Sequence, residues 1–313
     1  MSMKKEALPD KFEGGMLGCA LGDAIGEIAF RCHTIKDLEA EIEKTDVLIY
    51  TDDTAMALGL AESLIRKNDI DQQDIGDTFA RNFFKEPWRG YASGPPTIFS
   101  LVKNSGCSYV EVAKTLFGGS GSFGNGAAMR IVPVGLRFFD SSHLYDKAAA
   151  SAEVTHAHPV GKDGAAIQAM AIGLAVRTDP GFSFDPFDFV DKLVQKAKTD
   201  EIKSKLRLVK DLLQNNAPPK EAIKSIGCSV AVHESMPFSL YSFLKHPTSF
   251  KDCLYCAVLH GGDRDTLGAM ACSISGAFLG IRSLPVKWLD KLENEEYITE
   301  LARELLKSRS TSC

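Results

Sequence analysis

The chain has 313 residues, of which 41 are acidic and 36 basic, and 44% are apolar. These values lie near the average for globular proteins and exclude collagen-like, coiled-coil and low-complexity classes. The net charge of −5 provides no basic footprint, which argues against direct binding of nucleic acid.

The two ends of the chain are polar, and we expect flexible tails over residues 1–11 and 307–313. No segment has the order of a secretory signal, and no apolar run reaches the ~20 residues of a membrane-spanning helix. The eight cysteines form no disulfide framework. We therefore expect reduced thiols, a cytoplasmic location and no membrane association.

Apolar residues recur at helical spacing, and the alternation typical of strands is rare. Residues 191–215 are amphipathic and rich in lysine, which predicts one surface helix. Proline-containing segments predict a loop over 178–188 and a break over 216–219. The other predicted helices are residues 54–67, 164–177 and 268–279. The pattern indicates an all-α chain with one domain over residues 12–306.

Two acidic clusters stand directly before predicted helices. One contains Asp52 and Asp53, and the other contains Asp263 and Asp265. These acids could cap the helices, because carboxylates suit helix N-termini. One cap needs one side chain, however, and four converging carboxylates would repel one another unless a hard cation such as Mg²⁺ or Ca²⁺ neutralised them. From the residues alone, capping and metal binding remain equally open.

The segment Gly118–Gly126 is rich in glycine and precedes another helix. Its backbone amides could cradle a phosphate, and Phe123 could stack on a base or a ribose. A flexible loop is the alternative, since no Walker lysine follows the glycines. Farther along, His156 and His158 have no adjacent carboxylate or cysteine, which favours a stacking or capping role over metal ligation.

Seven motifs occur in a fixed order along the chain. They are GCALGDAIG (18–26), YTDDTAM (50–56), RGYASGPPT (89–97), GSFGNGAAMR (121–130), THAHPVG (155–161), HESMPFSLYSFL (233–244) and HGGDRDTLG (260–268). With this ordered set the chain resembles the ADP-ribosylglycohydrolase family from about Phe12 to Leu279. The resemblance is greatest to the branch that hydrolyses poly- and serine-linked ADP-ribose.

The resemblance implies a multi-helix orthogonal bundle with two Mg²⁺ ions and, as partner, ADP-ribose or an ADP-ribosylated protein. The oligomeric state remains open. The two ions would hold the ribose hydroxyls beside the scissile anomeric carbon, and the glycine-rich loop would wrap the diphosphate. The implied metal ligands are Thr51, Asp52, Asp53, Asp263, Asp265 and Thr266, and the implied ligand-binding residues are Gly121, Ser122, Phe123, Gly124, Asn125 and His156.

The departure from the branch that bears on catalysis is at position 30. The catalytic glutamate of the branch lies seven residues after the aspartate that corresponds to Asp23, and this chain has Phe30 there. Phenylalanine cannot exchange a proton, whereas general acid–base catalysis typically contributes ~10²–10⁴-fold. Glu27, about 4.5 Å back along a helix axis, is a substitute candidate, with a solvated or capping acid as the alternative. Arg264 replaces a small polar residue and either points outward or brings a cation near the second metal.

Two hypotheses follow from this departure. A retained pocket without its proton-transfer residue predicts a catalytically impaired protein, as in the J-type crystallins of jellyfish lenses, a non-enzymatic offshoot of the family. The alternative is a working Mg²⁺-dependent hydrolase that releases ADP-ribose from protein serine or poly(ADP-ribose). It would use Glu27, or a metal-activated water held by Asp53.

Overall fold

The computed structural model describes residues 7–182 and 184–311, and its regular elements are all helices. Within these residues, the β-pairing consists of two isolated bridges, Leu48–Leu292 and Gly124–Ala231. The all-α prediction is therefore confirmed. The helices are α1 (Leu8–Ala29), α2 (Ile35–Lys44), α3 (Asp52–Lys67), α4 (Gln72–Lys85), α5 (Gly94–Ser105), α6 (Tyr109–Thr115), α7 (Gly126–Met129), α8 (Val132–Arg137), α9 (Leu144–Glu153), α10 (Pro159–Arg177), α11 (Pro186–Lys196), α12 (Asp200–Gln214), α13 (Pro219–Ile226), α14 (Val232–Lys245), α15 (Phe250–Val258), α16 (Arg264–Leu279), α17 (Val286–Leu289) and α18 (Glu295–Lys307), with 3₁₀ turns η2 (Phe117–Gly119), η3 (Ile281–Ser283) and η4 (Ser308–Thr311).

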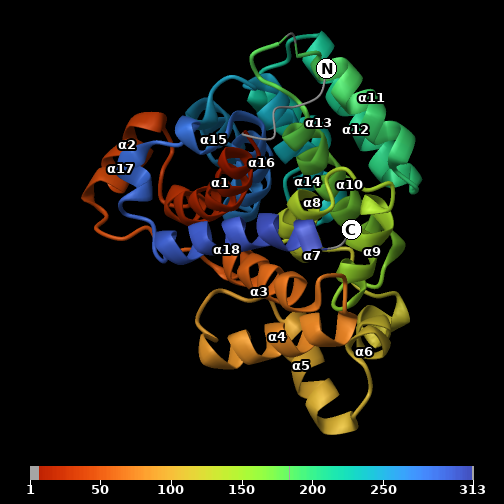
Figure 1. Ribbon diagram of the computed structural model, residues 1–313. Helices are drawn as coiled ribbons and strands as arrows, with labels where there is room; N and C mark the ends of the chain where they lie inside the picture. The colour runs from red at the N-terminus through yellow and green to blue at the C-terminus, as the bar shows by residue number, and fades with distance from the viewer. Residues whose placement is uncertain (1–6, 183, 312–313) are drawn as a thin grey trace.

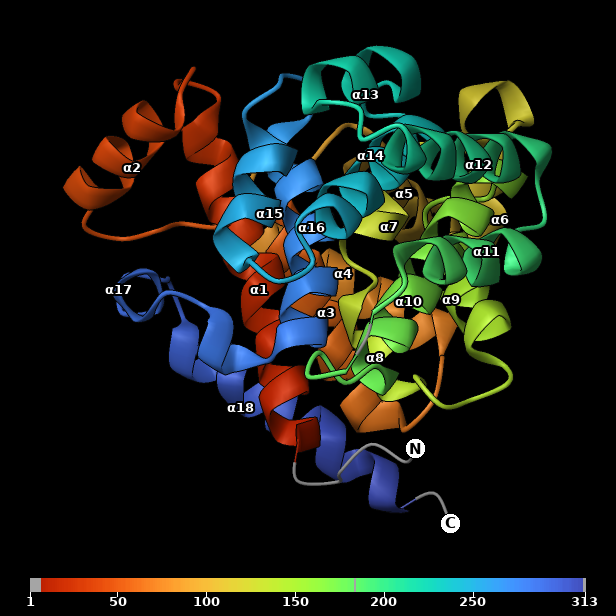
Figure 2. The same cartoon turned by 90° about the horizontal axis from the view of Figure 1, so that it is seen from above.

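Helices α1 and α16 lie side by side in the middle of the fold (Figures 1 and 2). Glycine recurs every four residues along α1, at positions 14, 18, 22 and 26, so these glycines share one face. A Cβ added to Gly22 would lie 2.2 Å from the carbonyl oxygen of Gly268 on α16. The glycine face thus lets the two backbones touch, and it fixes how far Asp23 lies from the start of α16.

The remaining helices surround this central pair. Figure 1 shows α4, α5 and α6 as a lower layer beneath α3, while α2 and α17 lie on the opposite side from α11 and α12. The buried apolar side chains form one continuous core. Among the described residues, no helix is long and apolar enough to cross a membrane, and the seven cysteines there are free thiols.

The single helix predicted over residues 191–215 is wrong, because the chain there forms α11 and α12. The cause is the buried carboxylate of Asp163, which accepts hydrogen bonds from the backbone amides of Lys198 and Thr199 and from the Thr199 hydroxyl. This carboxylate caps the start of α12 from a distant part of the chain. The predicted helices 54–67, 164–177 and 268–279 lie within α3, α10 and α16, and the predicted loop 178–188 ends where α11 begins at Pro186.

Both ends of the described chain are more ordered than the expected tails. Helix α1 already begins at Leu8, and the buried ammonium of Lys11 donates to the carbonyl oxygens of Thr178 and Phe278 at 2.8 Å. At the other end, Arg309 forms an ion pair of 2.6 Å with Asp140. Residues 1–6 and 312–313 lie outside the described residues.

Candidate functional site

A cavity of about 410 Å³ lies between the start of α3, the start of α16 and the glycine-rich loop before α7. Its volume is typical of small-molecule sites. Thr51, Glu27 and Phe30 do not line it. The predicted residues that line it together are Asp52, Asp53, Asp263, Asp265, Thr266, Gly121, Ser122, Phe123, Gly124, Asn125 and His156.

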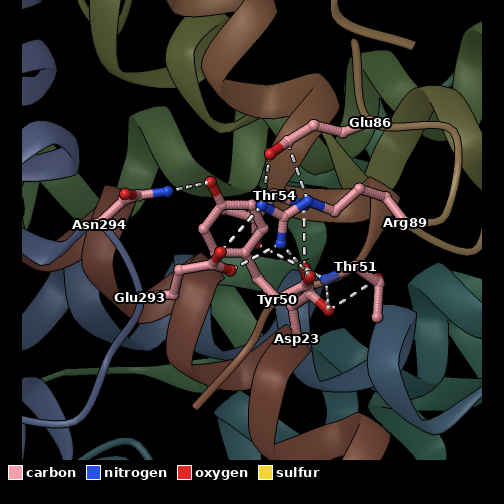
Figure 3. Close-up of polar contacts among 8 residues, drawn as sticks. All are labelled: Asp23, Tyr50, Thr51, Thr54, Glu86, Arg89, Glu293 and Asn294. Carbon is pink, nitrogen blue, oxygen red and sulfur yellow. Dashed lines mark hydrogen bonds and ion pairs between the residues drawn. The ribbon is translucent and has the colours of Figure 1, made fainter. Parts of the chain in front are cut away.

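The carboxylate of Asp23 organises the start of α3 from the neighbouring helix α1. Asp23 is fully buried and accepts hydrogen bonds from the backbone amides of Thr51 and Thr54 at 3.0 Å. The hydroxyls of the same two threonines donate to it at 2.8 and 2.6 Å (Figure 3). Thr51, the N-cap residue, makes no side-chain cap of its own. Because Asp23 satisfies these donors, Asp52 and Asp53 are not needed for capping.

In the second cluster, the side chain of the first acid, Asp263, does not cap its helix either. Asp263 is the N-cap of α16 but makes no side-chain cap, and its Oδ2 accepts instead from Asn125 Nδ2 at 2.6 Å. Asp265 Oδ1 accepts from the backbone amide of Thr266 at 2.9 Å. The Thr266 hydroxyl also lies 3.4 Å from Asp53 Oδ2, so the two clusters meet. The contacts therefore disfavour the capping interpretation.

Burial and mutual repulsion make these carboxylates reluctant to ionise together. Burial, followed by the charge of Asp23, raises the pKa of Asp52 to about 7. Burial, followed by the charge of Asp263, raises the pKa of Asp265 to about 8. The pKa of Asp53 is raised well above its usual range by burial and then by Asp23, and its Oδ1 is buried without a hydrogen-bond partner. A bound cation would relieve this repulsion.

The donors available here suit a hard divalent cation, because carboxylate and hydroxyl oxygens are the ligands that Mg²⁺ and Ca²⁺ prefer. The unpartnered Oδ1 of Asp53 adds a free lone-pair donor at the same place. Over residues 7–182 and 184–311, no group of three or more Asp, Glu, His or Cys side chains lies close enough together to hold a metal ion. Threonine hydroxyls and water would thus have to complete the ligand set.

Arg130 is a buried cation beside the cavity. It donates to the carbonyl oxygen of Gly126 at 3.2 Å and to the Thr155 hydroxyl at 2.8 Å. Burial lowers the pKa of Arg130 to about 9, opposed by the charge of Asp52. The Thr155 hydroxyl also lies 2.7 Å from His156 Nδ1. Burial, followed by the charge of Arg130, lowers the pKa of His156 to about 3, so its ring is neutral at pH 7.

The glycine-rich loop is held in place by backbone pairing. The amide of Asn125 donates to the carbonyl oxygen of Val230 at 2.9 Å, and the amide of Val232 donates to that of Phe123 at 3.1 Å. A Cβ added to Gly126 would lie 3.0 Å from His156 Cε1, so this glycine permits close packing on the histidine ring. These contacts favour an ordered segment over the flexible loop that was the alternative.

Two aromatic rings line the cavity on its exposed side. Phe123 is 46% exposed, and its ring lies 5.3 Å from that of His158. Phe117 is 65% exposed and adopts a left-handed backbone conformation with φ 52°. Such a φ is unfavourable for an aromatic residue. The two rings leave apolar faces available to a planar ligand.

The end of α1 supplies no acid to the cavity. Glu27 is exposed, and Phe30, the C-cap residue of α1, is 47% exposed. The guanidinium of Arg264 donates to the carbonyl oxygens of Ala29 and Cys32, the latter at 2.9 Å. Of the two orientations expected for Arg264, the structure therefore has the outward one, in which the guanidinium binds carbonyl oxygens at the end of α1.

Sequence reasoning did not single out four residues that shape the site. Asp23, the aspartate of the first motif, holds the start of α3, and Arg130, the last residue of the glycine motif, supports His156 through Thr155. The other two are Phe117, which lines the cavity, and Arg89, which donates to the carbonyl oxygen of Tyr50 just before α3. The ordered motifs contained three of these four residues, but only the fold shows which atoms they contact.

Comparison with known proteins places this geometry among its relatives. The sequence profile of a family described as ADP-ribosylglycohydrolase matches residues 4–313. The ADP-ribosylhydrolase ARH3 of Homo sapiens is 31% identical over 336 aligned positions, which cover 94% of this chain and 92% of the relative. The ADP-ribosyl-[dinitrogen reductase] glycohydrolase of Rhodospirillum rubrum is 28% identical and covers 93% of each chain. A solved structure described as an ADP-ribosylglycohydrolase-related protein complex shares the fold, with a TM-score of 0.73, 22% identity, and coverage of 97% of this chain and 99% of that one.

Proposed function

The chain belongs to the ADP-ribosylglycohydrolase family, and from this premise we propose that it binds ADP-ribose beside two Mg²⁺ ions but hydrolyses ADP-ribosyl bonds poorly. One observation carries the proposal. The cavity keeps its carboxylates and its glycine-rich loop, whereas neither Glu27 nor Phe30 lines it. Binding and proton transfer depend on different residues, so one function survives the loss of the other.

The two helix starts would hold the ions. Thr51, Asp52 and Asp53 would ligate from α3, and Asp263, Asp265 and Thr266 from α16. When bound, the ions would neutralise the carboxylates, hold the ribose hydroxyls and polarise the substrate. Asp23 and Asn125 would keep the ligands in place through the hydrogen bonds described above.

The glycine-rich loop would bind the nucleotide part. Gly121, Ser122 and Gly124 line the cavity. The amides of Gly121 and Gly124 donate to the Leu116 carbonyl oxygen and the Ser122 hydroxyl, both at 3.1 Å, so the amide of Ser122 would be the one to face a diphosphate. The rings of Phe117 and Phe123 would flank the adenine. The neutral ring of His156 would support the loop without placing a further charge in the pocket.

Hydrolysis requires a proton for the leaving oxygen or nitrogen as the anomeric bond breaks and water attacks. Phe30 cannot provide it, and Glu27 is exposed on α1 outside the cavity. We expect turnover to be lower by the ~10²–10⁴-fold that a general acid or base contributes. A working hydrolase would instead need Asp53 to position the attacking water, which is the alternative that the experiment below tests.

A structural role like that of the lens crystallins is a second candidate. It is favoured by the same observation, because such a role needs a stable fold and a single large core but no acid at position 30. Measuring the abundance of the protein in its source tissue would test this role. For location we propose the cytoplasm, in keeping with the free thiols of the described residues.

The deciding experiment combines binding with turnover. Isothermal titration of ADP-ribose, with and without millimolar Mg²⁺, should show metal-dependent binding. Release of ADP-ribose from a serine-ADP-ribosylated peptide and from poly(ADP-ribose) should be slow beside the human relative under the same conditions. Turnover within tenfold of that relative would overturn the impairment, and absence of ADP-ribose binding would overturn the retained pocket.

A further inference from the structure

Arg89 lies in the turn between α4 and α5, and its side chain is only 3% exposed. It contacts Glu293 at 2.6 and 3.0 Å and Glu86 at 3.0 and 3.2 Å (Figure 3). Two carboxylates already satisfy its charge. Its Nη1 nevertheless also donates to the backbone carbonyl oxygen of Tyr50 at 3.0 Å, and the guanidinium lies over the Tyr50 ring at 4.2 Å.

The segment 291–294 forms a second set of hydrogen bonds with Tyr50 and the nearby Leu48. The side chain of Asn294 donates to the Tyr50 hydroxyl at 2.9 Å. The amide of Leu48 donates to the carbonyl oxygen of Lys291 at 2.8 Å, and the amide of Glu293 donates to that of Leu48 at 3.0 Å. Residues close to the C-terminus therefore hold the short extended segment that leads into the first carboxylate cluster.

The residue after Arg89 reaches the cavity itself. Gly90 lines the cavity with φ 90°, and a Cβ added there would lie 3.8 Å from Asp52 Oδ1. The segment Tyr50–Thr54, which leads into the first turn of α3, is thus held on one side by Asp23 and on the other by Arg89 and segment 291–294. An ion pair that served folding alone would have no need of the contact to the Tyr50 carbonyl.

We propose that Arg89 is a positioning residue, which fixes the backbone entering Thr51–Asp53 by joining it to segment 291–294. The inference rests on the proposed function in one respect, namely that Thr51, Asp52 and Asp53 are metal ligands. Because outer-shell partners hold ligands in their binding geometry, loss of Arg89 should weaken divalent-cation binding roughly 10–100-fold. The C-terminal segment is then part of the site although none of its residues lines the cavity.

Three variants separate positioning from simple ion pairing. Arg89→Met removes every contact, and Arg89→Lys keeps the charge without the planar set of donors that reaches several acceptors at once. The double variant Arg89→Met/Glu293→Gln also removes the more buried of the two carboxylates left without their partner, and should recover part of the lost stability toward urea. If Arg89 positions the loop, the double variant still binds Mg²⁺ weakly, and Arg89→Lys lies between it and the wild type. Recovery of wild-type Mg²⁺ affinity by the double variant would overturn the proposal.

Hydrogen exchange provides a readout that does not depend on the metal. Amides of Thr51 and Thr54 are protected by Asp23, so exchange in peptides covering Tyr50–Thr54 should accelerate at least tenfold in both Arg89→Met variants. Unchanged exchange there would refute positioning. The matched control is Arg303→Met, which breaks the ion pair of α18 with Glu13 outside the cavity and should leave this exchange unchanged. If the wild-type protein does not bind Mg²⁺, that result would count against the proposed function only. Hydrogen exchange over Tyr50–Thr54 would still test whether Arg89 positions this segment.

Discussion

Asn125 and Asp263 are joined by a hydrogen bond of 2.6 Å, which connects the glycine-rich loop to the second carboxylate cluster. The two residues are 138 positions apart in the chain, and each belongs to a different half of the proposed site. A ligand that contacts the loop would therefore also affect the position of the Asp263 carboxylate. Binding of nucleotide and of metal should be coupled, and the coupling must be the same in both directions.

Asn125→Ala should uncouple the two binding events. Loss of a hydrogen bond to a charged group typically costs about 1.5–3 kcal/mol, so ADP-ribose should bind more weakly and its dependence on Mg²⁺ should shrink. Calorimetric titrations with each ligand, alone and in the presence of the other, measure the coupling directly. Asn82→Ala, which alters a contact to Glu62 outside the cavity, is the control. Full coupling in the Asn125→Ala protein would contradict the prediction.

Asp23→Ala should both destabilise the fold and abolish metal binding. It leaves the amides and hydroxyls of Thr51 and Thr54 without their acceptor, at a cost of at least about 3 kcal/mol for several buried donors. Urea unfolding and Mg²⁺ titration are the measurements. Asp163→Ala is the matched control, because this carboxylate caps α12 in the same manner away from the cavity. That variant should lose stability while its Mg²⁺ affinity stays unchanged, and a parallel loss of affinity would show that general instability explains both.

The metal-free protein should become less stable as the pH rises. The raised pKa values of Asp52 and Asp265, about 7 and 8, mean that the folded state binds more protons than the unfolded state above the ordinary carboxyl pKa of about 3.9. Their stabilising contribution is complete below that value and is lost as the pH rises through about 7 to 8. Melting temperatures between pH 5 and 8.5 should therefore fall without metal.

Millimolar Mg²⁺ should restore stability at the upper end of this pH range, because the cation replaces the missing protons. The variant Asp265→Asn should show a flatter profile without metal, since one of the coupled carboxyls is gone. A melting temperature that rises with pH in the metal-free wild type would contradict the assigned pKa shifts. Lack of any Mg²⁺ effect at pH 8 would count against the metal site.

Introducing an acid at position 30 should not by itself give fast hydrolysis. Phe30 does not line the cavity, and Arg264 ties the carbonyl groups of Ala29 and Cys32 to the start of α16. We expect Phe30→Glu alone to raise the initial rate on a serine-ADP-ribosylated peptide less than tenfold. The double variant Phe30→Glu/Arg264→Ser should gain more, because the segment can then turn toward the pocket. A large gain in the single variant would show that the tether is not limiting.

The sequence predicted that the chain is helical and which residues gather at the cavity. It did not predict the hydrogen bonds that hold these residues in place. Apolar periodicity identified α3, α10 and α16, and the acids of both clusters line one cavity. What escaped prediction came from contacts between distant positions. The capping of α12 by Asp163, of α3 by Asp23, and the tethering of α1 by Arg264 each depend on partners 28 or more positions away.

The glycine face of α1 has a consequence for the choice between Mg²⁺ and Ca²⁺. A Cβ at Gly26 would lie 2.5 Å from Asp265 Cα, so a larger residue at this position would push the start of α16 away from α1. Ca²⁺ takes longer metal–oxygen distances and more ligands than Mg²⁺, which keeps a small octahedron. A wider spacing would suit the larger ion, so the discrimination between these two cations would depend in part on glycines that never touch either of them.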